Sequence, residues 1–175
     1  MLGHYTQLVT EIVAAPDKAI SGYDLLSDDE RHQILLEWNA TQAEYPQDQC
    51  IHHLFEAQVE RTPDAVAVVF DDRPLTYGEL NRRANQLAHY LISLGVGPES
   101  LVGICLERSL AMVIGICGIL KAGGAYVPLD PTYPAERLRF MLDDAQVPVL
   151  LTQHHLLDNL PDHQTPVICL VTDWA

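Results

Sequence analysis

The sequence predicts an α/β fold in which a mainly parallel β-sheet is flanked by helices and preceded by a helical linker. Residues 101–106 and 147–151 are almost continuously apolar, which is typical of strands that are buried on both faces. Helical patterns of ten or more residues separate the strands, as the crossovers of a parallel sheet require. Residues 16–50 contain one helical pattern and no strand pattern, so we expect a linker ahead of the sheet.

Two helices are predicted within the first fifty residues, followed by irregular connection at residues 39–48. A stripe of apolar residues at helical spacing indicates a helix that ends before Pro16. The stripe consists of Tyr5, Leu8, Val9, Ile12 and Val13. A second helix is expected to begin at Ser27, because Ser27 and Glu30 have the spacing of a capping box. The apolar residues of this helix are Ile34, Leu35 and Trp38.

A change of pattern at Cys50 marks the start of alternating helices and strands. A helix is predicted from Ile51 to a point near Pro63, because a proline disfavours helical backbone in the residue before it. Residues 65–70 are apolar and rich in valine, which predicts a strand. Residues 71–74 are expected to form a turn.

A longer helix is predicted to follow that turn. Thr76 and Glu79 have the spacing of a second capping box, and Gly95 and Gly97 are expected to end the helix. The face that we expect to be buried consists of Leu80, Ala84, Leu87, Ala88 and Leu91. Residues 101–106 then form the first strand of the sheet.

The remaining chain continues with helices between strands. Ser109 is expected to cap a helix that runs through Leu120 and ends at Gly123 and Gly124. Further strands are predicted at residues 126–129, 147–151 and 167–171. Between the first two of these, Pro134 suits the first position of a helix. The apolar face of that helix contains Leu138, Met141, Leu142 and Ala145.

Composition excludes several classes of function. The net charge of −14 on 175 residues repels phosphate backbones, so we expect no nucleic-acid partner. The longest apolar run, residues 110–120, is shorter than the roughly 20 residues of a membrane span, and no secretory signal is evident, so we expect no membrane association. The four cysteines are Cys50, Cys105, Cys117 and Cys169. Because none has C-x-x-C spacing, we expect no zinc or redox site and a reducing cytoplasm.

No residue is predicted to be catalytic, to bind a cofactor or to bind a metal. The pairs His52-His53 and His154-His155 are expected to lie on the surface, because adjacent side chains diverge and no cysteine or carboxylate has ligand spacing on the same face. Gly123 and Gly124 follow a helix, whereas phosphate-binding loops follow a strand. Cys105 and Cys117 lie in apolar runs and are expected to be small buried side chains.

Two motifs nevertheless resemble a known family. Residues 75–80 read LTYGEL and residues 120–130 read LKAGGAYVPLD. Both resemble the opening motifs of the amino-acid adenylation domain of nonribosomal peptide synthetases, and ERTPDAVA at residues 60–67 adds to the likeness. Residues 1–15 resemble the last helix of a condensation domain, and residues 16–50, with LLEWN at 35–39, resemble the linker. Residues 51–175 resemble a truncated amino-terminal subdomain of the adenylation domain, so we expect a partial sheet.

The resemblance implies an ATP-dependent ligase as the parent enzyme. A complete domain of this family uses ATP and Mg²⁺ to form an aminoacyl-adenylate, and then loads it onto the phosphopantetheine thiol of a carrier protein. The motifs that carry this chemistry lie later in the family than the two found here. The resemblance therefore implies that the chain itself binds no cofactor and is inactive. The implied partners are the remainder of the adenylation domain, an upstream condensation domain and the carrier protein.

Two alternatives remain open at the level of sequence. The chain is also compatible with the start of another adenylate-forming enzyme, such as an acyl-CoA or aryl ligase, and with a non-catalytic module for docking between domains. His154, His155 and Asp158 only approximate the paired-histidine motif of condensation domains, because the spacing is one residue short and Asn159 replaces the glycine. We therefore expect no condensation site.

Overall fold

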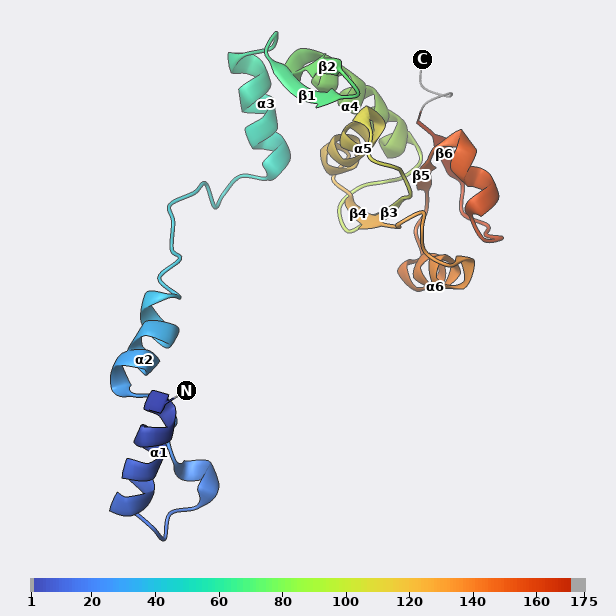
Figure 1. Cartoon of the computed structure of the whole chain (residues 1–175). Coiled ribbons are helices and arrows are strands. Elements are labelled where there is room, and N and C mark those ends of the chain that lie inside the picture. Colours follow the sequence, from blue (N-terminus) through green and yellow to red (C-terminus); the bar gives the residue numbers. More distant parts are fainter. Residues whose placement is uncertain (1, 171–175) are drawn as a thin grey trace. The chain divides into compact units, whose positions relative to one another are not determined.

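The computed structural model describes residues 2–170, and the chain divides into two compact units, Met1–Gln47 and Asp48–Ala175. Residues 38–50, which include the boundary, contain neither helix nor strand (Figure 1). Within residues 2–170, none of the helices combines the length and the apolar character needed to cross a bilayer.

The first unit consists of short helices joined by polar contacts. Its elements are α1 (Leu2–Ala14), the 3₁₀ helix η1 (Ile20–Gly22), α2 (Asp28–His32) and the π-helix η2 (Gln33–Glu37). Both predicted helices are confirmed, as is the capping box: Ser27 Oγ accepts from the Glu30 amide at 3.2 Å, and Glu30 accepts from the Ser27 amide at 3.0 Å. Glu30 also lies 3.0 Å from His4 Nε2, which joins α2 to α1.

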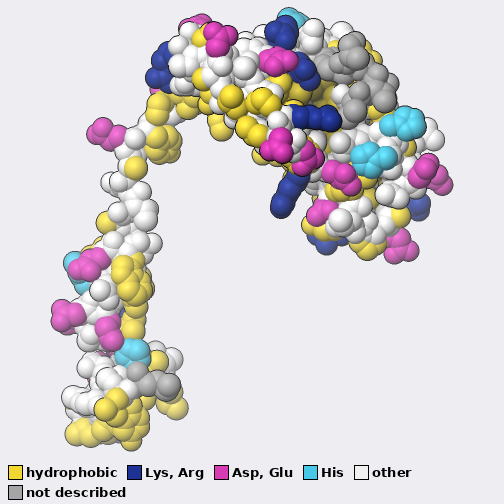
Figure 2. Space-filling model, turned by 45° about the horizontal axis from the view of Figure 1, so that its top comes forward, with side chains coloured by type: hydrophobic (Ala, Val, Ile, Leu, Met, Phe, Trp, Pro, Cys, Tyr) yellow, Lys and Arg dark blue, Asp and Glu magenta, His cyan; other side chains and the backbone are white. Residues whose placement is uncertain are grey.

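The apolar stripe of α1 is not covered within its own unit. No residue between 2 and 47 is buried, and Tyr5 and Val13 are 67% and 76% exposed. Figure 2 shows hydrophobic side chains at the surface of the first unit. The first unit therefore has no hydrophobic core of its own.

The second unit begins with a helix and a hairpin. Helix α3 (Ile51–Arg61) is followed by β1 (Val66–Phe70), β2 (Arg73–Thr76) and α4 (Tyr77–Ser93). Strands β1 and β2 pair antiparallel and form a separate sheet. The predicted four-residue turn at 71–74 was too long: only Asp71 and Asp72 turn, with φ of 47° and 58°, and residues 73–76 form a strand. Two successive positive φ values give the tight turn that suits a twisted hairpin.

The main sheet has four parallel strands in the order β4-β3-β5-β6, which confirms the predicted fold class. The strands are β3 (Leu101–Ile104), β4 (Ala125–Pro128), β5 (Leu150–Thr152) and β6 (Val167–Cys169). Helix α5 (Leu110–Lys121) connects β3 to β4, and α6 (Ala135–Ala145) carries the chain back across β3 to β5. Right-handed crossovers that run in opposite directions must lie on opposite faces of the sheet. The order of strands therefore places α5 and α6 on opposite faces (Figure 1).

Each face of the sheet has its own hydrophobic cluster. Val102 and Ile104 of β3 belong to the cluster that includes α4 and α5, whereas the buried side chains of Cys105 and Leu150 belong to the cluster around α6. All five residues predicted for the buried face of α4 are buried. Alternation along β3 thus divides the core into two layers, as a strand covered on both sides requires.

Helix ends follow the predicted capping residues. Gly95, with φ of 91°, follows α4, where its amide donates to Ile92 O at 2.9 Å and the Val96 amide donates to Leu91 O at 3.0 Å. This pair of bonds is a Schellman motif, which requires the left-handed conformation that glycine adopts without strain. The predicted cap at Ser109 is also confirmed, because its hydroxyl accepts from the Met112 amide at 3.3 Å.

Some boundaries differ from the prediction. The strand expected at 147–151 begins only at Leu150, since Pro148 has no amide to contribute to a ladder. Pro134 is the N-cap of α6 rather than its first helical residue. The 3₁₀ helix η3 (His154–Asn159) was not predicted, and Val171, the last residue of the final predicted strand, lies outside the described residues.

Helices α4 and α5 approach each other closely at Gly118. A Cβ atom built on Gly118 would lie 2.7 Å from Leu87 Cδ2 and 3.0 Å from Leu87 Cβ. The Leu87 Cβ cannot rotate away, so a methyl group at position 118 must push the helices apart. Gly97 offers a control, because nothing lies within 4 Å of its Cβ position.

We expect Gly118→Ala to destabilise the second unit. Alanine gains about 1 kcal/mol of helix propensity over glycine, but overpacking a close contact costs about 1–3 kcal/mol. Urea unfolding followed by circular dichroism should give a lower midpoint for Gly118→Ala and an unchanged midpoint for Gly97→Ala. Equal midpoints for the two variants would show that the helices have room to adjust.

We also expect proteolysis to begin between the two units. Residues 41–50 are exposed and lack regular structure, whereas Glu107 follows a strand of the core sheet. A protease specific for glutamate should therefore cut after Glu44 first and leave a resistant fragment, as judged by mass spectrometry. First cleavage after Glu107 would contradict this prediction.

Candidate functional site

Ligands of open parallel sheets bind at the carboxyl ends of the strands, at the point where the crossovers go to opposite faces of the sheet. Here that point lies between β3 and β5. Gln153, which is buried, accepts from the Glu107 amide at 3.0 Å, and the buried Thr152 hydroxyl donates to Cys105 O at 2.9 Å. These polar groups satisfy one another, so they hold the two strand ends together.

Two acidic side chains at this edge, Glu107 and Asp130, are exposed and engaged with neighbouring residues. Glu107 lies 3.2 Å from His155 Nε2. Asp130 accepts from the amide and hydroxyl of Thr132 at 2.9 and 2.7 Å, and the Thr132 amide holds the pKa of this carboxyl below its usual range. The amides of Glu107, Leu129, Thr132 and Tyr133 at this edge already donate to protein acceptors. The residues present therefore do not fit a complete site for ATP and Mg²⁺.

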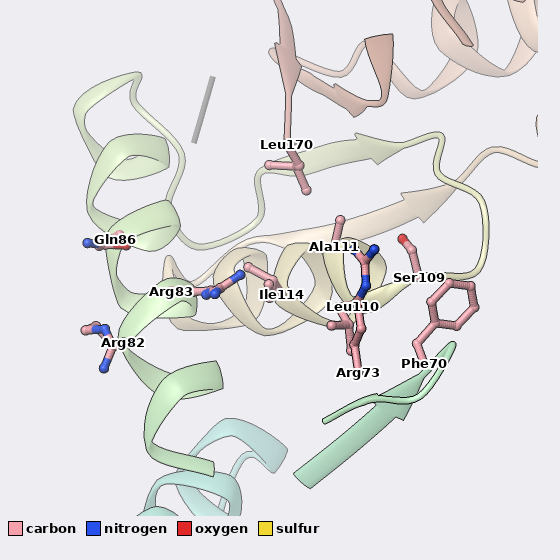
Figure 3. Close-up of a pocket in the computed structure, with 10 residues that line it drawn as sticks. All are labelled: Phe70, Arg73, Arg82, Arg83, Gln86, Ser109, Leu110, Ala111, Ile114 and Leu170. Carbon is pink, nitrogen blue, oxygen red and sulfur yellow. The ribbon is translucent and has the colours of Figure 1, made fainter. Parts of the chain in front are cut away.

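A pocket of about 560 Å³ lies between the hairpin, α4 and the start of α5 (Figure 3). In Figure 3 the Arg83 side chain extends toward Ile114, and Arg73, Leu110 and Leu170 also line the pocket. Arg83 also donates to Glu79 at 3.1 Å. Guanidinium groups can hold an anionic group, but they do not act as general bases because they remain protonated.

A second pocket of about 650 Å³ lies beyond the carboxyl ends of β3 and β4. Its walls are mostly apolar, including Met112, Ile116 and Tyr126, and Glu107 and Arg108 also line it. Such a pocket suits an apolar side chain or ligand, and its lining contains no cysteine, serine, histidine or lysine.

The cysteine thiols of the core are unsuited to catalysis. Burial, together with the nearby charge of Asp130, raises the pKa of the Cys105 thiol to about 11. Burial also raises the pKa of the Cys117 thiol. Since the thiolate is the nucleophile, the raised pKa values disfavour reaction at neutral pH. Cys105 is buried as expected, whereas Cys117 is only partly buried.

The long motif at residues 120–130 is a helix end and a strand start. The Gly123 amide donates to Leu120 O and the Gly124 amide to Ile119 O, both at 3.1 Å, and Gly123 has φ of 84°. A Cβ on Gly124 would lie 3.0 Å from Val96 and 3.1 Å from Ser100 O. One glycine is thus required by backbone conformation and the next by close packing, so both have structural reasons to be there.

The motif at residues 75–80 begins α4. The Thr76 hydroxyl accepts from the Glu79 amide at 3.2 Å, which confirms half of the predicted capping box, while the Glu79 carboxylate accepts from Arg83. A Cβ on Gly78 would lie 3.2 Å from Pro63 O, whose carbonyl accepts the Gly78 amide at 2.8 Å. The motif therefore fixes the start of α4 against the segment that follows α3.

Lys121 of the long motif joins α5 to α3. Its ammonium group forms an ion pair with Glu56, and it lies 5.8 Å from the centroid of the Phe55 ring. The Lys121 side chain is only 5% exposed, whereas that of Glu56 is 44% exposed. The hydrogen bond from Lys121 holds the pKa of the Glu56 carboxyl below its usual value of 4.5.

The two histidine pairs lie in different surroundings. His154 and His155 begin η3, where His155 faces Glu107. His52 and His53 lie in the first turn of α3, and their ligand atoms are within 4.8 Å of each other and of Cys50 Sγ. The expectation that no cysteine has ligand geometry beside His52 and His53 is therefore wrong. That expectation considered only the faces of a helix, whereas Cys50 is the N-cap, whose side chain lies over the first turn.

Comparison with known proteins assigns the family. The model of the AMP-binding enzyme family matches residues 55–175. The chain therefore belongs to the AMP-binding enzymes.

Relatives narrow this assignment to the nonribosomal peptide synthetases. The chain is 53% identical over its whole length to a linear gramicidin synthase polypeptide of Brevibacillus parabrevis, of which it covers 3%. It is 52% identical over 158 residues to gramicidin S synthase 2 of Brevibacillus brevis, covering 90% of this chain and 4% of that protein. The chain thus spans a small part of the length of these relatives.

Solved structures agree with the sequence relatives. The crystal structure of the nonribosomal peptide synthetase FmoA3 in its AMPPNP-bound form matches 98% of this chain and 19% of its own, with a TM-score of 0.74 and 33% identity. The N-terminal subdomain of Klebsiella oxytoca NpsA matches 73% of this chain and 32% of its own, with a TM-score of 0.65 and 27% identity. Within the AMP-binding enzymes, this is a nonribosomal peptide synthetase adenylation-domain sequence, as the two motifs predicted.

The two partners of the Lys121–Glu56 ion pair differ in burial, so we expect their substitution to destabilise the fold to different extents. Glu56→Gln leaves a nearly buried ammonium group without its carboxylate, which should cost about 1–3 kcal/mol. Lys121→Met leaves a carboxylate that is largely in solvent, which should cost no more than about 1 kcal/mol. Urea unfolding at neutral pH should therefore rank Glu56→Gln below Lys121→Met in stability.

The pH dependence of this difference follows from the lowered pKa of Glu56. A carboxyl group with a lowered pKa in the folded state contributes stability above its unfolded pKa, and this contribution is lost as the pH falls through the folded value. The difference in the free energy of unfolding between the parent chain and Glu56→Gln should become smaller below about pH 4.5. A difference that stays constant down to pH 3 would argue against the ion pair.

Proposed function

We propose that this chain is the amino-terminal part of an adenylation domain that, when complete, activates an amino acid with ATP and loads it onto a carrier protein. The observation that carries this proposal is the 53% identity to the linear gramicidin synthase polypeptide over all 175 residues. The complete reaction forms an aminoacyl-adenylate and then transfers the aminoacyl group to a phosphopantetheine thiol. ATP, Mg²⁺ and the carrier are therefore requirements of the complete enzyme.

We propose the same domain division as the sequence suggested. Residues 1–15 are the end of a condensation domain, 16–50 are the linker and 51–175 belong to the adenylation domain. The exposed stripe of α1 supports a condensation domain as partner, because an apolar face of this kind needs a surface to pack against. The position of the boundary between the two compact units, at Gln47 and Asp48, also supports this division.

The remainder of the adenylation domain is the second proposed partner. Strands β4 and β6 are the edges of the main sheet, and Tyr126 and Val167 on these edges are 42% and 37% exposed. Unpaired strand edges with apolar side chains favour association with further structure. The proposal places the complete enzyme in the cytoplasm, without membrane or nucleic-acid partners, in keeping with its cysteine spacing and its net charge of −14.

We propose that the chain alone is inactive. Phosphoryl-type transfer requires cations and amides arranged around the phosphate groups. At the carboxyl edge of the sheet, Glu107 and Asp130 are engaged with His155 and Thr132. The pocket between the hairpin, α4 and α5, which is lined by Arg73 and Arg83, provides no general base. No step of the reaction is therefore assigned to a residue of this chain.

We expect no amino-acid-dependent ATP–pyrophosphate exchange from the purified chain, because the residues at the carboxyl edge of the sheet do not fit a site for ATP and Mg²⁺. Exchange should appear when the chain is co-produced with the segment of the Brevibacillus parabrevis linear gramicidin synthase that follows the matched region. The measurement is incorporation of labelled pyrophosphate into ATP with each of the twenty amino acids in turn.

The control is that gramicidin synthase segment alone, which should be inactive. Exchange above background from the chain alone would contradict its proposed inactivity. Association of the two pieces without exchange would argue for a docking module instead of an adenylation subdomain.

A further inference from the structure

The start of α3 brings together three side chains that ligate transition metals. Cys50, His52 and His53 each offer one ligand atom, and the three atoms lie within 4.8 Å of one another. Among the described residues, no other group of three histidine, cysteine or acidic side chains meets this condition. The cluster lies within the second unit and is separate from both pockets.

Local backbone geometry produces the cluster. Cys50 is the N-cap of α3, with extended φ and ψ of −73° and 153°, and its carbonyl accepts from the His53 amide at 3.0 Å. An N-cap side chain projects over the first turn, toward the residues two and three positions later. The Cys50 side chain makes no capping hydrogen bond, so its exposed thiol is available to a ligand.

The two imidazoles are arranged to act as ligands beside that thiol. Their ring centroids are 4.3 Å apart and the ring planes are inclined by 63°, so the rings do not stack face to face. His52 Nδ1 is enclosed and has no hydrogen-bond partner within the described structure.

We propose that Cys50, His52 and His53 form a binding site for one transition-metal ion of the Zn²⁺ type. In a tetrahedral site with bonds of about 2.3 Å to sulfur and 2.0 Å to nitrogen, ligand atoms are about 3.3–3.6 Å apart. The atoms here are within 4.8 Å, so small side-chain rotations close the site. One thiol and two imidazoles suit Zn²⁺ or Co²⁺, whereas Mg²⁺ and Ca²⁺ require oxygen ligands.

The site has three protein ligands and one open position. Glu56, one turn further along α3, is engaged by Lys121 and is not needed as a ligand. Water can occupy the fourth position, as it does in zinc sites with three protein ligands. A bound ion ties the residue before α3 to the first turn of that helix and so stabilises the start of α3. This proposal replaces the expectation that the chain binds no metal.

The test is a titration of the full, untagged chain with Co²⁺, under a reductant that does not bind metals. We expect one Co²⁺ per chain, with a thiolate-to-cobalt charge-transfer band in the near ultraviolet that Zn²⁺ abolishes by displacement. Binding should release protons, because a coordinated thiol must be deprotonated. Thermal unfolding should also shift to higher temperature with added Zn²⁺.

Substitution of individual ligands tests whether Co²⁺ binds at this cluster or elsewhere on the chain. Cys50→Ser should abolish the charge-transfer band, and His53→Gln should weaken Co²⁺ binding by at least about tenfold, since even outer-shell changes cost about 10- to 100-fold. The double variant His154→Gln, His155→Gln is the matched control, because that pair is not in a three-ligand cluster, and it should bind as the parent does. Circular dichroism of each variant confirms that the fold is intact.

Two results would overturn the proposal. One is the absence of saturable Co²⁺ binding at millimolar concentrations. The other is a charge-transfer band that persists unchanged in Cys50→Ser, because the thiolate would then belong to another cysteine. Neither result bears on the proposed adenylation function, because that proposal is tested separately by ATP–pyrophosphate exchange.

Discussion

The close contact between α4 and α5 is the constraint on which the second unit depends. Gly118 allows Leu87, which is fully buried, to pack directly against the backbone of α5. Helix α5 lies between α4 and the sheet, so it is apolar on nearly every side, and it shares one cluster with α4, β3 and β5. Its last residue, Lys121, holds α3 through Glu56. The position of α5 thus determines how the sheet, α4 and α3 are joined.

Where the sequence carried a periodic signal, the fold could be predicted. The stripe from Leu80 to Leu91 specified the buried face of α4, because helical spacing is visible over several turns. The hairpin strand after Asp72 was not visible, since Arg73 and Pro74 do not read as a strand and only pairing with β1 makes them one. The 3₁₀ helix at His154 was missed for a related reason: its six residues are too few to show a period.

The candidate sites were also predictable only in part from the sequence. The order of helix and strand identified Gly123 and Gly124 as a helix end, and both family motifs have structural explanations in the caps at Thr76 and Gly123. The cluster at Cys50 could not be found by considering helical faces, because an N-cap residue lies outside the helical repeat. A search for metal ligands in a sequence should therefore also consider the N-cap residue, whose side chain can lie over the first turn of the helix.

The lack of buried side chains in residues 2–47 has a consequence for the exchange of modules between synthetases. Every residue of the two hydrophobic clusters lies at or after Phe55, so a junction between residues 39 and 47 separates no pair of core neighbours. Different upstream sequences can be joined there without refitting a core. Recombination at this segment therefore leaves both hydrophobic clusters intact.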